Sequence, residues 1–306
     1  MNVKLASLVV LLFCNFGAFV HRVVNETVLT ECKKNKKFSE LFNNEFSAAF
    51  VKRAAEPDNR RGKDKNERYK HYFHVNAYNT DTFSKYINRE EFKKYILKAK
   101  ESGDYRDISD VDKYMKVHGD LPWTIVEKIE LIKSLLSDLY NADGKKDING
   151  LKKKILTECI NLAHYITDFC TPLHLNRDYD GRYSDQEGLH KMWETSIPNL
   201  LLRIYRKEVI GKYKSIRINF ENKDLYDFIF ELMFDVYKKS VDILDLEQEI
   251  FDVYKSKYKA IYYKKRFRSH KYIKLSAEYY SDVIIYQINL AISLITYIFN
   301  KHIFVD

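Results

Sequence analysis

The sequence predicts an all-α protein, built as a single compact multi-helix domain. Only 9 glycines and 4 prolines occur among its 306 residues, and hairpin and sandwich folds need more of these turn residues. Hydrophobic residues make up 45% of the chain, which is enough to bury a core and excludes an intrinsically disordered protein. No internal repeat and no Pro- or Ser-rich linker divides the chain, so we expect one domain.

The N-terminus has the pattern of a secretory signal. Lys4 precedes an apolar run from Leu5 to Phe13, and this run is too short to span a bilayer. We therefore expect residues 1–15 to be removed, leaving a domain of residues 16–306 in a secreted or lumenal protein. Cleavage after Ala18 is the alternative, because a small residue normally precedes the cleaved bond.

Apolar residues at helical spacing predict the main helices. The first covers Phe16–Leu29, another opens at Leu121-Pro122-Trp123 with proline in its first turn, and a third covers Leu151–Phe169, where Pro172 ends or bends it. Further helices are expected at about 189–207, 223–243, 246–263 and 275–300. Two polar stretches, Lys33–Lys37 and Arg60–Lys70, are expected to lie on the surface.

The last of these helices contains an apolar stretch from Val283 to Phe299, which Gln287 and Asn289 interrupt. A membrane span needs about 18 to 20 uninterrupted apolar residues, so we expect a buried core helix and no membrane span.

Three cysteines, Cys32, Cys159 and Cys170, follow the expected signal, so at most one intramolecular disulfide can form. If one helix carries Cys159 and Cys170, about 16 Å separates them, which is beyond disulfide reach. Any bridge would then include Cys32.

The residues best suited to chemistry lie between positions 164 and 194. His164 and Asp168 are four residues apart on a predicted helix, and His190 and Glu194 repeat this spacing, so each pair projects from one helix face. His174 follows Pro172, where the chain can turn back. Imidazole and carboxylate are the usual ligands of hydrolytic zinc sites. One such pair alone is typical of a helix surface, but the combined spacing of 4, 6, 16 and 4 residues indicates a metal site.

This pattern resembles the trinuclear-zinc phosphodiesterases, a superfamily of single-strand-specific nucleases and bacterial zinc-dependent phospholipases C. In that superfamily, His-x3-Asp-x5-His is followed by His-x3-Asp or His-x3-Glu. Residues Phe16 to His21 are similar to its mature N-terminus, Trp-Gly-x-x-x-His, with phenylalanine in place of tryptophan. Further elements that match are Pro57-Asp58, His71-Tyr72 and Gly119-Asp120-Leu121-Pro122-Trp123. The resemblance runs from Phe16 to about Pro198.

The resemblance implies three zinc ions per chain, in a cleft between helices. The implied ligands of the first are Asp58, His71, His164 and Asp168, and those of the second are His174, His190 and Glu194. The third zinc would be bound by the amino group and carbonyl of Phe16, by His21, and by Asp168 as a bridge. This third site requires cleavage just before Phe16.

The same residues give a physical route to phosphodiester hydrolysis. Two zinc ions that share Asp168 can hold a water and lower its pKa to near neutrality, which supplies a hydroxide nucleophile. The metals can also neutralise the charge that develops on the phosphate. Asp58 and Asp168 are therefore the candidate catalytic carboxylates. Arg61 lies where nuclease relatives often have a basic residue, and it either contacts the phosphate or is a solvated loop arginine.

The expected substrate is single-stranded DNA, RNA or a nucleotide, because 52 Lys and Arg against 43 Asp and Glu give a net charge of +9. The first alternative is a phospholipase C acting on phospholipid. Glu194 as the last ligand favours it, as does the lack of the nuclease branch's Gly-Gly-Asn element between His174 and His190. The second alternative is a non-catalytic binding protein that zinc stabilises. His74, three residues after His71, can replace or supplement a ligand, whereas His118, His270 and His302 match no motif position.

Overall fold

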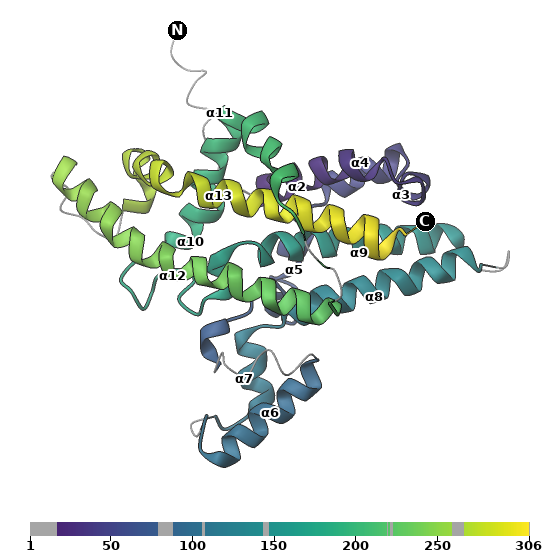
Figure 1. Cartoon of the computed structure of the whole chain (residues 1–306), viewed down its shortest axis with the longest axis horizontal. Helices are drawn as coiled ribbons and strands as arrows, with labels where there is room; N and C mark the ends of the chain where they lie inside the picture. The colour runs from purple at the N-terminus through teal and green to yellow at the C-terminus, as the bar shows by residue number, and fades with distance from the viewer. Residues whose placement is uncertain are drawn as a thin grey trace, which may run out of the picture.

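The computed structural model describes residues 17–78, 88–105, 108–142, 147–218, 220, 223–258 and 266–305 (Figure 1). Helices account for most of these residues and none of them forms a strand, so the predicted all-α class is confirmed. The expected signal segment 1–15 and the expected ligand Phe16 lie outside the described ranges.

Five long helices form the body of the molecule (Figure 1). They are α2 (Gly17–Cys32), α8 (Leu121–Tyr140), α9 (Ile148–Phe169), α12 (Leu225–Tyr258) and α13 (His270–Ile298). α8 packs along α9, and α13 contacts α2, α9, α11 and α12. The predicted start of α8 is confirmed, because Pro122 lies in its first turn as expected.

Shorter elements connect these helices. The α-helices are α3 (Lys36–Leu41), α4 (Asn44–Lys52), α5 (Glu56–Arg60), α6 (Arg89–Ser102), α7 (Val111–His118), α10 (Leu189–Lys191) and α11 (Ile197–Gly211). The 3-10 turns are η1 (Glu67–His71), η2 (Val75–Ala77), η4 (Pro172–Leu175), η6 (Lys212–Ser215) and η7 (Arg266–Arg268), and the π-helical turns are η5 (Met192–Ser196) and η8 (Phe299–Ile303). In Figure 1, α6 and α7 lie below the body and α11 rises above α13.

The sequence predicted two helices, at 223–243 and 246–263, and this prediction was wrong. One helix, α12, runs through Leu225–Tyr258. No glycine or proline interrupts these residues. The buried stripe continues through Ser240, Ile243, Glu247 and Ile250 at spacings of three and four residues. Glu247 is a charged member of this stripe, and it hides the helical period in the sequence.

α13 is the helix that the sequence predicted to lie in the core. Residues His270–Ile303 are long and apolar enough to cross a membrane by length and composition, yet most of the residues of α13 from Gln287 to Ile298 are buried. The two polar interruptions are also partnered inside the protein. Gln287 accepts a hydrogen bond from Trp193 Nε1 at 2.8 Å, and Asn289 donates one to the Val209 carbonyl at 2.7 Å. Both polar residues therefore join α13 to its neighbours.

The three described cysteines, Cys32, Cys159 and Cys170, are buried free thiols. Burial raises the pKa of the Cys32 thiol to about 12, so this thiol stays protonated at neutral pH.

Gly119 positions the start of α8 against the segment that carries His71. Its φ is +91°, and a Cβ there would lie 2.0 Å from the Tyr72 carbonyl oxygen. We expect Gly119→Ala to lower the free energy of unfolding by about 2 to 4 kcal/mol, from backbone strain and overpacking together. Urea denaturation checks this value. Gly62→Ala is the matched control, because a Cβ on Gly62 meets nothing within 4 Å. If the two variants were equally stable, Gly119 would not be required for its positive φ and its close approach to Tyr72.

Candidate metal centre

The structure brings together the eight expected ligand side chains that it describes. Their donor atoms form three groups, and within each group these atoms lie within 4.8 Å of one another. The groups are His21, His164 and Asp168; Asp58, His71 and His164; and His174, His190 and Glu194. The side chains come from α2, α5, η1, α9, η4, α10 and η5. Segments that are far apart in the sequence therefore meet at one place, and each group could hold a metal ion.

Asp168 belongs to the first group and also lies close to two members of the second, His71 and His164. Its Oδ2 atom is 2.8 Å from His71 Nδ1 and 3.3 Å from His164 Nε2. Its Oδ1 atom faces His21 Nε2 at 3.4 Å. The two oxygens of one carboxylate thus face different imidazoles, which is the arrangement that a carboxylate bridging two cations requires.

Asp58 completes this side of the centre from the short helix α5. Its Oδ1 atom lies 3.7 Å from both His71 Nδ1 and His164 Nε2. The Arg61 guanidinium is 2.9 Å from the same oxygen, and 43% of the Arg61 side chain is exposed. Arg61 is therefore a cation at the solvent-facing edge of the buried cluster.

The third group is built on a π-helical turn. His190 Nε2 lies 3.0 Å from Glu194 Oε1 and 3.0 Å from His174 Nε2, and His174 Nε2 also contacts Glu194 Oε1. The sequence predicted His190 and Glu194 on one helix. The structure divides them between α10 and η5, a kind of turn that is frequent at functional sites. All three donor atoms still converge.

Hydrogen bonds outside the clusters fix how two of the imidazoles are oriented. His164 Nδ1 donates to the Ala54 carbonyl at 2.9 Å, and His174 Nδ1 donates to the His71 carbonyl. In each ring the Nε2 atom is left facing the candidate ligands, which is how metal-binding histidines are usually held. The bond from His174 to His71 also ties the third group to the first two.

Glu67 is a supporting residue that the sequence analysis missed. It was expected in an exposed polar stretch, but only 2% of it is exposed, and its Oε1 atom lies 3.7 Å from His71 Nε2. Arg60 and Lys70 pair with its two oxygens, and the Tyr165 hydroxyl donates to it. The only signal in the sequence is its position four residues before His71.

The unusual pKa values follow from the burial of charged groups beside one another. Burial alone would lower the pKa of His164, but Asp168 and Asp58 outweigh it and raise this pKa to about 10. Burial opposes ionisation of Asp58, but His164 prevails and lowers its pKa to about 2. Burial and the neighbouring His164 lower the pKa of His21. The clustered carboxylates of Asp58 and Asp168 thus favour positive charge at this place, as protons or as a metal cation.

His74 and His118 form a separate pair. Their Nδ1 atoms lie 3.2 Å apart, and burial lowers the pKa of His74 to about 3 and that of His118 to about 4. Neither belongs to a metal-capable group among the described residues. His74 therefore has His118 as its hydrogen-bonding partner and lies outside the three groups.

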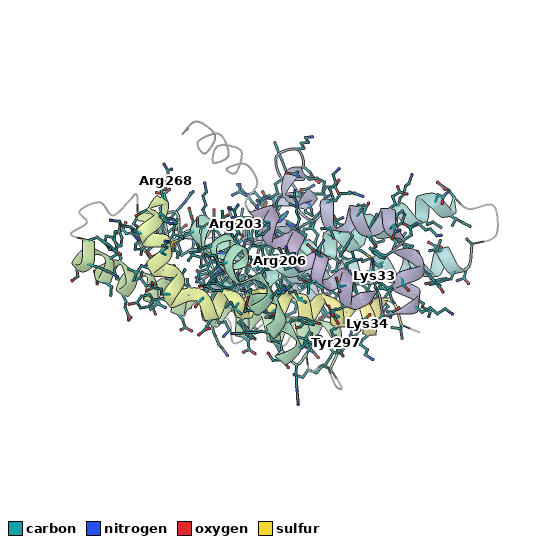
Figure 2. The ribbon with its side chains drawn as sticks, turned by 90° about the horizontal axis from the view of Figure 1, so that it is seen from above. Lys33, Lys34, Arg203, Arg206, Arg268 and Tyr297 are labelled. Carbon is teal, nitrogen blue, oxygen red and sulfur yellow. The ribbon has the colours of Figure 1, made fainter. Side chains whose placement is uncertain are left out.

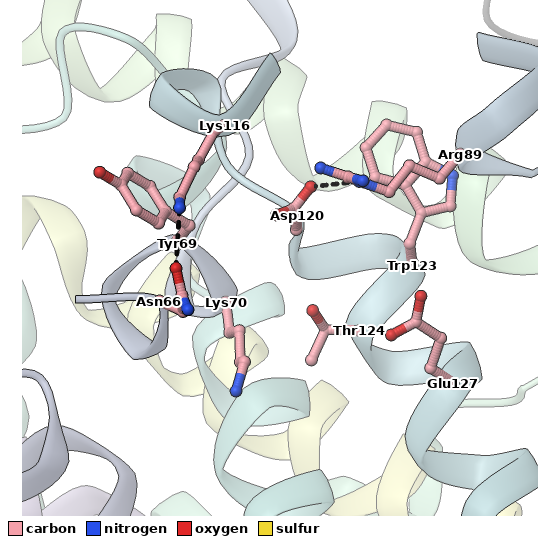
Figure 3. Close-up of a pocket in the computed structure, with 9 residues that line it drawn as sticks. All are labelled: Asn66, Tyr69, Lys70, Arg89, Lys116, Asp120, Trp123, Thr124 and Glu127. Atoms are coloured by element: carbon pink, nitrogen blue, oxygen red, sulfur yellow. Dashed lines mark hydrogen bonds and ion pairs between the residues drawn. The ribbon is translucent and has the colours of Figure 1, made fainter. Parts of the chain in front are cut away.

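A cavity of about 290 Å³ lies beside η1 and the start of α8 (Figure 3). Its lining includes Lys70, Arg89 and Lys116. Arg89 pairs with Asp120 at 2.9 Å, and Lys116 donates to Asn66 at 2.7 Å. None of the candidate metal ligands lines this cavity, so we treat it as distinct from the centre.

No family model, curated protein or solved structure matches the chain.

Proposed function

We propose that the protein is a secreted zinc-dependent phosphodiesterase, an endonuclease that hydrolyses single-stranded DNA or RNA. The observation that carries the proposal is that eight His, Asp and Glu side chains gather into three groups, each of which could hold a metal ion. Their order and spacing in the sequence resemble those of the trinuclear-zinc phosphodiesterases. The proposal thus rests on two separate observations, the motif and the geometry.

The residues present fit zinc. Five imidazoles and three carboxylates are the ligand types of hydrolytic zinc sites, and within each group their donor atoms lie within 4.8 Å of one another. We assign Asp58, His71, His164 and Asp168 to one ion and His174, His190 and Glu194 to a second. His21, Asp168 and Phe16 are assigned to a third. Bound zinc would activate a water and neutralise charge on the phosphate.

The chain's own residues would orient the substrate around this centre. Asp168 would keep two sets of ligands at a fixed separation, because one of its oxygens faces His21 and the other faces His71. Arg61 at the exposed edge would contact a non-bridging phosphate oxygen, since guanidinium is a good partner for phosphate. Its present partner, Asp58, fixes where the cation lies.

The net charge of +9 supports a nucleic-acid backbone as the substrate. A phospholipase C is the second candidate, and the specific observation that favours it is Glu194 as the last ligand of the third group. The nuclease and the phospholipase C would use the same metal chemistry, and they differ in the substrate that binds beside the metal centre.

Metal analysis and a substrate comparison test the proposal. We expect the purified protein, after N-terminal sequencing, to contain about three zinc ions per chain and to lose phosphodiesterase activity in a chelator. Single-stranded DNA, RNA, 3′-nucleotides and phosphatidylcholine would be assayed side by side. If only phosphatidylcholine were hydrolysed, the protein would be a phospholipase C and not a nuclease. Zinc without any hydrolysis would favour a zinc-stabilised binding protein, and the absence of zinc would refute the proposal.

A further inference from the structure

Residues 203–217, from the second half of α11 through η6, carry an unusual share of the charge. They contain six basic residues and one acidic residue, a net charge of +5 in a chain whose net charge is +9. We call this segment the cationic ridge, because α11 rises above α13 at this point (Figure 1). Its exposed cations are Arg203, Lys207, Lys212, Lys214 and Arg217.

Two apolar side chains stand exposed among these cations. Ile204 is 58% exposed and Tyr205 is 52% exposed. The helix is interrupted at Tyr205, where φ is −125° and ψ is 34°. The ridge thus presents an aliphatic and an aromatic side chain to solvent, with Arg203 and Lys207 on either side in sequence.

The ridge is part of the folded body. Leu201, Leu202 and Val209 of α11 are buried. Asn289 of α13 donates to the Val209 carbonyl at 2.7 Å, and Ser293 donates to the Tyr213 carbonyl at 2.9 Å. These contacts hold the ridge in a fixed position, so its charges are presented by a rigid support.

Two further cations, Lys33 and Lys34, lie just after the end of α2. Figure 2 shows Lys33 and Lys34 on the same face as Arg203 and Arg206. Glu26 pairs with Arg206 at 2.7 Å, and Glu31 pairs with Lys34 at 2.9 Å. Arg203, Lys207, Lys212 and Lys33, in contrast, have no ion-pair partner within 4.0 Å in the part of the chain that the structure describes. Their positive charge is available to a partner.

We propose that the cationic ridge docks the protein on the surface of an anionic phospholipid membrane. Charge complementarity favours an anionic partner, and exposed aliphatic and tyrosine side chains among Lys and Arg are the combination that binds at a lipid interface. Single-stranded nucleic acid prefers a basic groove with several aromatic stacking platforms, whereas this segment is a projection with one well-exposed tyrosine, Tyr205, beside an aliphatic side chain, Ile204. The inference is independent of the zinc centre.

Vesicle flotation tests the proposal. We expect the protein to float with phosphatidylcholine vesicles that contain phosphatidylserine and not with pure phosphatidylcholine vesicles, and we expect binding to weaken as salt rises. The triple variant Arg203→Glu, Lys207→Glu, Lys212→Glu should bind at least about 100-fold more weakly, since each cation near the surface contributes roughly a fivefold gain. Ile204→Ser with Tyr205→Ser should reduce binding by about tenfold without removing its dependence on phosphatidylserine.

The matched control makes the same charge change elsewhere. Lys94, Lys98 and Lys113 are exposed on α6 and α7, at the opposite end of the molecule in Figure 1. Their replacement by glutamate should leave vesicle binding within about threefold of the original. Circular dichroism and zinc content, measured on every variant, separate a binding defect from misfolding. Equal losses in the two triple variants would overturn the proposal, and so would binding of a single-stranded oligonucleotide through the ridge without vesicle binding.

Discussion

Asp168→Asn should abolish hydrolysis and lower the bound zinc from about three ions to about one per chain. The two carboxylate oxygens face His71 and His164 on one side and His21 on the other, so one substitution weakens two of the three groups. An amide offers one neutral oxygen in place of two that share a negative charge. The group of His174, His190 and Glu194 does not include Asp168 and should keep its ion. We expect the rate to fall at least about a thousandfold.

Zinc analysis and turnover, measured on the same preparation, check this expectation. Asp235→Asn is the matched control, because it makes the same chemical change at a side chain on α12 that is 71% exposed. It should retain both zinc and activity. Glu194→Gln provides a complementary arm, since it should remove one ion and leave the Asp168 groups filled. If Asp168→Asn kept all its zinc or its turnover, the bridging role would be wrong.

The sequence was most informative where ligands lie one helical turn apart. The spacings of His164 to Asp168 and of His190 to Glu194 predicted shared faces, and both pairs face each other in the structure. For Asp58 and His71 the sequence alone gave no geometric reason to meet. They lie on α5 and η1, whose positions depend on packing against α9, so only the resemblance to a known family placed them in the cluster.

The missed elements share a physical cause. The apolar periodicity predicts no helix between Leu29 and Leu121, where α3, α4, α5, α6 and α7 occur. These helices are short, and several begin at side-chain caps, such as Asn43 accepting from Phe46 N and Asn88 accepting from Glu91 N. A cap is a local signal that an apolar period does not reveal. Glu67 was missed for a related reason, because buried acids look like surface residues in a sequence.

A second buried acid leads to the largest stability effect that we expect. Glu247 of α12 and Arg266 of η7 have side chains that are 0% and 1% exposed, and Arg266 Nε lies 2.9 Å from Glu247 Oε1. The hydroxyls of Tyr272 and Tyr280 also donate to Glu247. This network joins the second half of α12 to the first half of α13, a helix that also contacts α2, α9 and α11. The buried charges of Glu247 and Arg266 are compensated only while all members of the network are present.

Arg266→Met should therefore lower the free energy of unfolding by about 3 to 5 kcal/mol, because it leaves a buried carboxylate without its cation. Arg53→Met is the control, because Arg53 pairs with Glu56 and its own side chain is 34% exposed. This substitution should lower the free energy of unfolding by about 1 kcal/mol or less. Glu247→Gln combined with Arg266→Met should be less unstable than the two single effects predict, by about 1 kcal/mol or more. Urea denaturation of the four proteins measures this coupling, and strict additivity would contradict it.

The pH dependence of the Arg266→Met variant provides an independent check. Burial raises the pKa of Glu247 above its ordinary value even though Arg266 and the tyrosines oppose the shift, and loss of Arg266 must raise it further. When a carboxyl has a higher pKa in the folded than in the unfolded state, the protein becomes less stable as the pH rises from the unfolded-state pKa through the folded-state pKa. The variant should therefore lose more stability, relative to the original protein, at neutral pH than near pH 4.5, where protonation removes the buried charge. A stability difference that does not change between these two pH values would show that Arg266 acts through its packing on Phe251 and Phe267 and not through its charge.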